Sequence, residues 1–200
     1  MAYGFLKIAT TPSVRAVQAE MGVDRDWQSA GAGRDFDRFS DNEAAFIAER
    51  DSFYMATVSE TGWPYVQHRG GPAGFLKVLD DRTLAFADYR GNRQYISTGN
   101  VAANDRACLF LMDYGRRARL KIYTHVEVIR PEADPQFAEK VVDVGYRAKV
   151  ERIFRLTLEA FDWNCSQHIT PRFSEAEVVE AVAPLRTRLS ELEAENAALL

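Results

Sequence analysis

A regular alternation of residue types between Arg119 and Val128 limits what this chain can fold into. Every second residue from Leu120 to Val128 is apolar or a threonine, and the residues between them are mostly polar. Successive side chains of a β-strand point to opposite faces, so a period of two predicts a strand with one face in a core. An α-helix, with 3.6 residues per turn, cannot gather these residues on one side.

Five further segments have the composition of short strands separated by turn residues. Aromatic and β-branched residues dominate them, and Gly, Pro and Asp-Asp mark the turns between several of them. About six strands joined by short turns predict a barrel or a sandwich. The five segments are 53–59, 65–69, 74–79, 83–87 and 107–112.

Helices are predicted before and after this block. A short one follows Pro12 over Ser13–Met21, and another runs through Ala44–Arg50 with Ser40 or Asp41 as its cap. Pro135–Val142 is a third candidate. The clearest is Arg147–Phe161, because Val150, Phe154, Thr157 or Leu158, and Phe161 would share one helical face.

The end of the chain carries apolar residues at heptad spacing. Pro184 would lie at or near the first turn of this helix. About two heptads are too few for a stable free coiled coil, so the helix either packs on its own barrel or pairs with a second subunit. The seam residues, with one Asn at a core position, are Val182, Leu185, Leu189, Leu192, Asn196 and Leu199.

Composition excludes several classes of protein. The net charge of −4 is opposite to that of a general nucleic-acid binder. The chain has no apolar run near the ~18 residues of a membrane helix and no signal-peptide pattern at its start. The two cysteines, Cys108 and Cys165, fit neither a disulfide framework nor a zinc site. We therefore expect a cytoplasmic protein that contacts neither membrane nor nucleic acid and holds no metal.

The segment from Gln67 to Gly74 has the most unusual composition. Three glycines and a proline within five residues do not suit an ordinary central strand. One interpretation is a bulged strand at a barrel corner. The other is close approach of a ligand to the backbone.

The segment from Asp88 to Ser97 leaves a strand, turns at Gly91 and is predicted to enter a helix near Asn92. Free N–H groups at a helix start attract anions, and Arg93 and Gln94 could bind a phosphate there. The plainer interpretation is a turn with Asn92 as the helix cap.

Two other segments are candidates for a site. Arg116–Arg119 reads as a solvated hairpin tip, and residues 163–173 form a polar connector of the kind that often lines a site. His125, on the polar face of its strand, is expected to be simply exposed. Dinucleotide and P-loop fingerprints, HExxH and a nucleophile elbow do not occur in the sequence.

Three of these motifs occur together in one known family. The strings QHRGGPAGF, RGNRQY and NCSQHITPRF, with the stretch from Phe53 to about Ile129, resemble the pyridoxamine 5′-phosphate oxidase-like FMN-binding split-barrel proteins, and a bacterial subgroup of them in particular. Residues 1–40 and the tail after Ser174 lie outside the resemblance. The tail offers no match to a set of residues that would recognise pyridoxamine phosphate.

The resemblance implies a mainly β chain with flanking α elements: a six-stranded split β-barrel with C-terminal helices. The barrel domain would span 41–173, between an N-terminal extension (1–40) and a C-terminal helix with the short heptad seam (174–200). The family forms homodimers with two FMN sites at the interface. Carried over by motif, the cofactor-binding residues are Gln67, His68 and Arg69 along the flavin, Ala87 and Asp88 at a strand end, Asn92, Arg93, Gln94 and Ser97 around the phosphate, Arg117 in the next hairpin, and Gln167, His168 and Arg172 closing the site from the partner chain.

The resulting hypothesis is an FMN-dependent oxidoreductase acting on a small organic molecule, with NAD(P)H as one option for the electron donor. No catalytic residue is assigned, although His168 and Tyr89 are the best candidates for a proton donor. The alternatives are a non-catalytic flavin-binding module and a haem-binding relative with His68, His125 or His168 as axial ligand. Because neighbouring strand residues face opposite ways, Arg69 and His68 cannot both face a flavin ring without a bulge.

Overall fold

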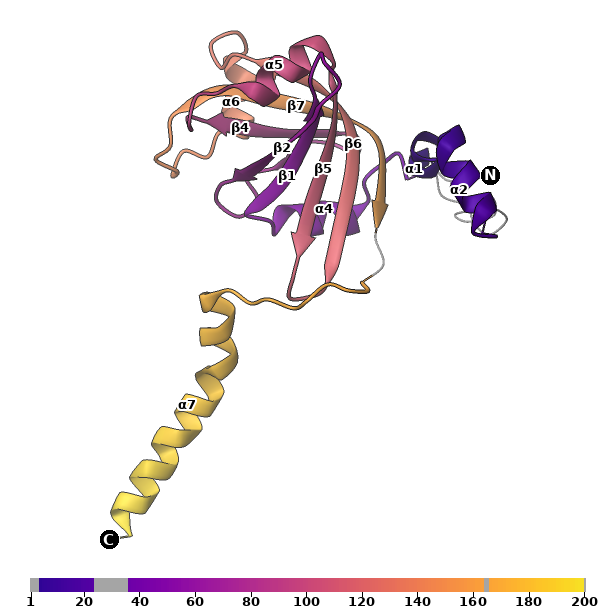
Figure 1. The fold of residues 1–200 in the computed structure, drawn as a ribbon. Coiled ribbons are helices and arrows are strands. Elements are labelled where there is room, and N and C mark those ends of the chain that lie inside the picture. The colour runs from indigo at the N-terminus through magenta and orange to yellow at the C-terminus, as the bar shows by residue number, and fades with distance from the viewer. Residues whose placement is uncertain (1–3, 24–35, 164–165, 200) are drawn as a thin grey trace. The chain divides into compact units, whose positions relative to one another are not determined.

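The computed structural model describes residues 4–23, 36–163 and 166–199. The chain divides into two compact units. The first contains residues 1–112 and 119–165, and the second contains 113–118 and 166–200. Figure 1 shows the elements of both units.

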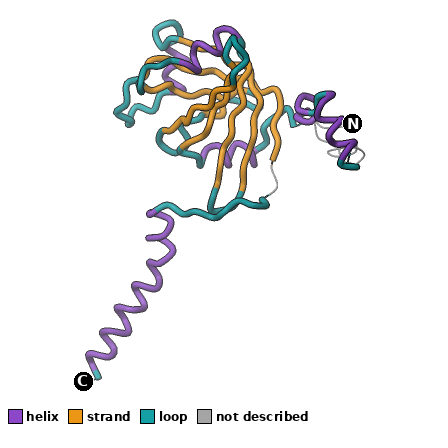
Figure 2. The backbone as a smooth tube through the Cα atoms, viewed as in Figure 1, coloured by secondary structure: helices purple, strands orange, loops and turns teal. Residues whose placement is uncertain are grey.

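The first unit is built on one mainly antiparallel sheet, seen as the orange strands of Figure 2. Its strand order is β2-β1-β5-β6-β7-β4-β3, so two short-range hairpins are joined through the long strands β6 and β7. The strands are β1 Ser52–Val58, β2 Pro64–Gly70, β3 Lys77–Val78, β4 Thr83–Tyr89, β5 Arg106–Asp113, β6 Ala118–Ile129 and β7 Val150–Trp163.

Helices precede, interrupt and follow the strands along the chain (Figure 1). The cap of α4 is Ser40, whose N–H and hydroxyl donate to Glu43 at 2.9 and 2.6 Å, as the sequence predicted. Glu43 is fully buried and also accepts from the Trp163 indole at 2.8 Å, which ties α4 to the end of β7. The helices are α1 Gly4–Ala9, α2 Pro12–Glu20, α4 Asp41–Ala48, α5 Ile96–Ala103, α6 Pro135–Val141 and α7 Glu175–Ala198.

The core of the first unit is aromatic. Phe86 of β4 stacks on Phe154 of β7 at 5.0 Å, and Phe53 of β1 meets Phe86 edge-on at 5.3 Å. All three rings are at most 1% exposed. Burial of large aromatic side chains dominates the stability of a core of this size.

The predicted helix over Arg147–Phe161 is wrong, because these residues form most of the 14-residue strand β7. Apolar residues in this segment fit both the helical period of 3.6 residues and the strand period of two. The alternating residues Phe154, Leu156, Leu158 and Ala160 are fully buried, while Thr157 and Glu159 are exposed. Pairing with β6 on one side and β4 on the other decides in favour of the strand.

The prediction of a mainly β chain with flanking helices is confirmed, but the count of six strands is wrong. The seventh strand is β7, and the sheet is not closed. After β7, the described part of the chain contains one helix, α7, where we predicted more than one. Pro184 lies in the middle of α7 and not near its first turn.

The glycine-rich segment is not a bulged strand. β2 pairs with β1 in unbroken register from Ser52↔Gly70 to Val58↔Pro64. The glycines after it are required by packing within the chain. A Cβ on Gly71 would lie 2.6 Å from the Phe75 ring. Gly74 has φ +75°, and a Cβ there would lie 2.9 Å from the Ala48 carbonyl oxygen.

The strand assignment of β7 predicts which side chains stabilise the protein. Leu156 is buried in the strand but lies off the apolar face that the helical pattern would bury. We expect Leu156→Ala to lower the free energy of unfolding by about 2–5 kcal/mol. Its exposed neighbour serves as the control: Thr157→Ala should change that free energy by less than about 0.5 kcal/mol. Urea unfolding measures both, and a larger loss at Thr157 would contradict the strand.

Candidate functional site

A pocket of about 260 Å³ lies between β2, β4 and the loop that leads into α5. Its lining residues come from a short stretch of β2, from the end of β4 with the following loop, from the first turn of α5 and from the start of β7. They include Tyr65, Gln67, His68, Arg69, Ala87, Asp88, Tyr89, Asn92, Arg93, Gln94, Tyr95, Ser97, Thr98 and Glu151.

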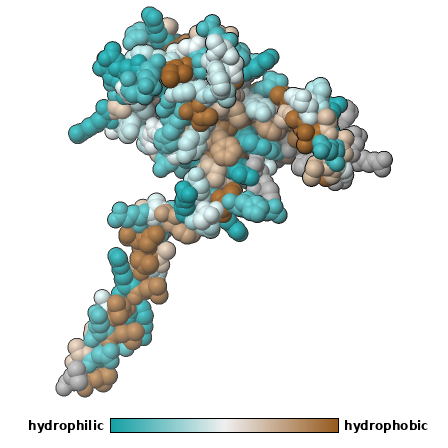
Figure 3. Space-filling view, viewed as in Figure 1, coloured by the Kyte–Doolittle hydropathy of each residue, from teal (hydrophilic) through white to brown (hydrophobic). Residues whose placement is uncertain are grey.

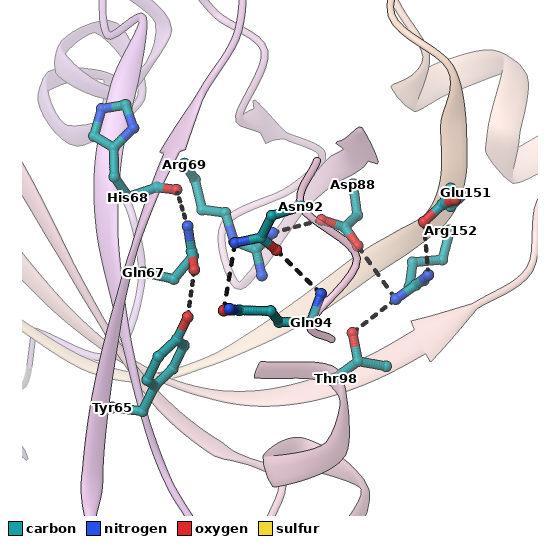
Figure 4. Close-up of polar contacts among 10 residues, drawn as sticks. All are labelled: Tyr65, Gln67, His68, Arg69, Asp88, Asn92, Gln94, Thr98, Glu151 and Arg152. Carbon is teal, nitrogen blue, oxygen red and sulfur yellow. Dashed lines mark hydrogen bonds and ion pairs between the residues drawn. The ribbon is translucent and has the colours of Figure 1, made fainter. Parts of the chain in front are cut away.

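The regular alternation of β2 decides which of its side chains enter the pocket. Tyr65, Gln67 and Arg69 lie on the less exposed face of the strand, and His68 lies on the other. The Tyr65 hydroxyl donates to Gln67 at 2.5 Å. Figure 4 shows the His68 ring directed away from Gln67 and Arg69; it packs edge-on against Tyr54 at 5.6 Å. Arg69, and not His68, therefore presents its side chain to the pocket.

A charged cluster forms the floor of the site (Figure 4). Arg69 donates to Asp88 at 2.5 Å, and the Arg152 guanidinium lies 3.6 Å from the other carboxylate oxygen of Asp88. The Arg69 guanidinium also lies 5.4 Å from the centre of the Phe154 ring. Its Nε is buried without a partner among the described residues.

Burial perturbs the ionisation of this pair. It raises the pKa of Asp88, although the guanidinium groups of Arg69 and Arg152 act in the opposite direction. Burial likewise lowers the pKa of Arg69, against the effect of Asp88. The carboxylate of Asp88 and its hydrogen bond favour the charged form of Arg69. The pocket floor thus keeps a cation with one N–H free to donate.

The loop from Arg90 to Tyr95 has a strained backbone. Arg93 and Tyr95 adopt left-handed φ values of 63° and 55°, which cost roughly 1–2 kcal/mol each for residues with a Cβ. The Asn92 side chain accepts from the Gln94 N–H at 3.1 Å, and the Arg152 guanidinium lies 4.4 Å over the Tyr95 ring. Strain held in place by such contacts is typical of functional loops.

Because of this loop, the following helix begins later in the sequence than we predicted. We predicted a helix starting near Asn92 with Asn92 as its cap, but α5 begins at Ile96 with Tyr95 at the cap position and no side chain capping it. Asn92 instead folds onto the backbone of Gln94. The Tyr95 side chain therefore caps none of the N–H groups in the first turn of α5, and helix geometry gives these groups no intrahelical partner.

Two hydroxyls in the pocket wall also have no partner among the described residues. Ser97, in the first turn of α5, is 3% exposed, and its Oγ is buried. The Tyr89 hydroxyl is buried as well, and burial raises its pKa to about 12. Tyr89 therefore remains protonated at neutral pH and can donate a hydrogen bond. A buried polar atom without a partner is costly, so the Ser97 hydroxyl indicates where a polar ligand fits.

This set of donors suits an elongated ligand with an anionic end. The first turn of α5 and the Arg93 guanidinium can face the anion. Amides at Gln67, Asn92 and Gln94 and the Ser97 hydroxyl can serve its polar groups. Within the described ranges, no group of three metal-ligating side chains occurs. The helices of those ranges are too short or too polar to cross a membrane.

The structure gathers nine of the thirteen predicted site residues around this pocket: Gln67, His68, Arg69, Ala87, Asp88, Asn92, Arg93, Gln94 and Ser97. The remaining four belong to the second compact unit. There, Arg117 and His168 have left-handed backbones, and the Arg172 guanidinium lies 5.1 Å from the centre of the Tyr114 ring. Their part in the site stays a prediction.

Sequence reasoning missed Arg152, Glu151 and Tyr65. Arg152 is the cross-strand partner of Asp88 in the β4–β7 pairing, so the mistaken helix over this segment hid it. A strand reading of 150–163 would have placed a cation opposite the predicted Asp88. His125, expected to be simply exposed, is 42% exposed but hydrogen-bonds Asp105 at 2.9 Å.

Comparison with known proteins places this architecture in a family. The family model for pyridoxamine 5′-phosphate oxidase matches residues 39–163. The chain therefore belongs to the pyridoxamine 5′-phosphate oxidase family, as its motifs suggested. No curated protein matches the sequence.

Several solved structures are similar to the chain. HupZ of Group A Streptococcus is 16% identical, with 68% of this chain and 100% of that one covered and a TM-score of 0.48. A candidate pyridoxamine 5′-phosphate oxidase from Lactobacillus delbrueckii is 19% identical, with 63% and 94% covered and a TM-score of 0.49. A protein of Clostridium acetobutylicum related to general stress protein 26 is 14% identical, with 68% and 94% covered and a TM-score of 0.46.

The charged cluster gives a test of the site's construction. Asp88→Ala would leave Arg69 and Arg152 without their shared buried carboxylate, so we expect the free energy of unfolding to fall by about 3–5 kcal/mol. Asp81→Ala is the matched control, because Asp81 pairs with Arg38 at an exposed position and should cost at most about 1 kcal/mol. Equal losses in urea unfolding would mean that the cluster is not buried as described.

Proposed function

We propose that the pocket binds FMN and that the protein is an FMN-dependent oxidoreductase acting on a small organic molecule. The observation that carries the proposal is the buried, unpartnered Ser97 hydroxyl in the uncapped first turn of α5, beside the strained Arg93 loop. Arg93 and Ser97 both line the pocket, so a guanidinium, a hydroxyl and backbone N–H groups are available for a phosphate dianion. Family membership supports the same cofactor.

The rest of the pocket suits the remainder of this cofactor. The Gln67 amide and the free Nε of Arg69 can meet polar ring atoms, and the backbone of Ala87 and Asp88 runs along the same wall. The bound flavin would supply hydride and electron transfer. The protein would hold it, keep Arg69 charged beneath it, and offer the neutral Tyr89 hydroxyl as a proton donor at the pocket wall.

We propose further that the active form is a homodimer with two FMN sites at the interface. The family resemblance puts the Gln167-His168 and Arg172 motif of the partner chain over the pocket. Arg117 would reach the cofactor from the β5–β6 hairpin. NADH or NADPH is the proposed source of electrons.

The phosphate site predicts a specific loss of affinity. Arg93→Ala should weaken FMN binding roughly 10- to 100-fold, because a charge-assisted hydrogen bond contributes about 1.5–3 kcal/mol. Arg130→Ala removes an equally exposed arginine far along the chain and should leave the affinity unchanged. Fluorescence titration of the cofactor-free protein with FMN gives both dissociation constants. If the Arg93→Ala variant kept full affinity for FMN, the phosphate would not bind at this loop.

The visible spectrum of the purified or FMN-loaded protein tests the cofactor itself. We expect flavin absorption with FMN released on denaturation. A Soret band after reconstitution with haem, without flavin binding, would favour the haem-binding alternative and overturn the proposal.

The enzymatic half of the proposal needs a separate measurement. FMN-loaded protein should oxidise NADH or NADPH faster than the same concentration of free FMN. Tyr89→Phe should bind FMN with unchanged affinity but turn over more slowly, because it loses only the buried hydroxyl. Turnover equal to that of free FMN, with tight FMN binding, would leave a non-catalytic flavin module.

A further inference from the structure

The C-terminal helix α7 carries an apolar seam that the proposed flavin site does not use. It begins at Ser174, which forms a capping box with Glu177, and runs 24 residues to Ala198. Numbered as heptads, its core positions a and d fall on seven residues. We call these the α7 seam: Val178, Val182, Leu185, Leu189, Leu192, Asn196 and Leu199.

The α7 seam is open to solvent along most of its length. Leu185 is 71% exposed and Leu189 57%, and Val182 is the one described residue of the helix that is not classed as exposed. Brown hydrophobic side chains follow the helix in Figure 3. Pro184 occupies position c, off the seam, so its ring does not interrupt the apolar contacts. A row of exposed leucines of this length marks an interaction surface.

We infer that two copies of this chain pair through the α7 seam as a parallel two-stranded coiled coil. Leucine fills every d position from Leu185 onward, and a valine occupies position a at Val182, a combination that favours two strands. In a parallel pair, Asn196 meets its own copy and the two amides can hydrogen-bond. In an antiparallel pair, it would face a leucine and bury an unpaired amide, which is costly.

The charges beside the seam complement each other between copies. In a parallel coil, position g of one helix faces position e of the next heptad in its partner. Arg188 is at g and Glu193 at e, so the two-fold axis gives two opposite-charge pairs. Within one helix, Glu193 has no charged residue three or four positions away. Arg188 pairs with Glu191 at 2.9 Å in its own chain and can also reach across.

Three heptads are marginal for a free coiled coil, but α7 is attached to a folded domain. Any association of those domains raises the effective concentration of one helix near the other. The coil would in turn hold two domains together before a cofactor is bound. The inference uses only α7, so it does not depend on flavin binding.

Cysteine cross-linking in the full chain tests the pairing. In a parallel coil, equivalent d positions face each other at a distance that a disulfide can bridge. Under mild oxidation, Leu192→Cys should give a covalent dimer on a non-reducing gel. Glu191→Cys, at the adjacent outward position, should not, and neither should the wild type with its two native cysteines.

Several outcomes would overturn the inference. Equal cross-linking at 191 and 192 would mean that the helices meet by random collision. Because Leu192→Cys removes a core leucine, Leu199→Cys with Ala198→Cys as its control repeats the test at the helix end. Both d positions failing to cross-link would reject the coil.

A charge swap tests the register between the two helices. Arg188→Glu and Glu193→Arg should each slow cross-linking of the Leu192→Cys protein by about two- to fivefold. The double variant should recover the rate, although residues five apart do not touch within one helix. Failure of the double variant to recover would contradict the parallel register.

The same samples separate this inference from the proposed function. FMN titration of the wild type and of the cross-linked dimer reports on the pocket alone. FMN binding without cross-linking would reject the coiled coil and support the flavin site. Cross-linking without FMN binding would support the coiled coil and reject the flavin site.

Discussion

The pairing of β7 with β4 is the constraint on which the site depends. It places Arg152 directly across from Asp88 and, on the inner face, Phe154 beside Phe86. The aromatic contact keeps water from the cluster, and the low local polarity makes the Asp88 carboxylate dependent on its two guanidinium partners. Arg152 also lies over the Tyr95 ring and so helps to fix the left-handed loop that lines the pocket.

A glycine-rich segment beside this pocket invites a functional interpretation that the packing does not support. Gly71 and Gly74 are required by Phe75 and by the Ala48 carbonyl. The donors that suit a ligand come instead from residues with ordinary side chains in an unusual backbone, Arg93 and Tyr95 above all. Stored strain and unpartnered buried atoms, more than glycine content, identify the site.

The residues that the family resemblance assigned to the flavin site are divided between the two compact units. The described pocket belongs wholly to the sheet unit. The terminal motif around His168 and the long helix α7 belong to the other, which contains an exposed apolar stripe and few buried residues of its own. A unit of that composition gains stability mainly through contacts with other surfaces. This is the reason to look for a second copy of the chain at both the proposed flavin site and the α7 seam.

The sequence by itself determined the local elements. The alternating residues predicted β6, and the cap at Ser40 or Asp41 predicted the start of α4 to within one residue. Three linked motifs led to the family and to nine residues that share one pocket. Tertiary structure decided the rest. Residues 150–163 fit both a helix and a strand, and only the open edges of β4 and β6 selected the strand. The same long-range pairing placed Arg152 in the site and turned Arg69, not His68, toward it. Neighbouring residues determine local patterns such as alternation and capping. Pairing between strands some 60 residues apart depends instead on which strand edges and apolar faces remain to be covered.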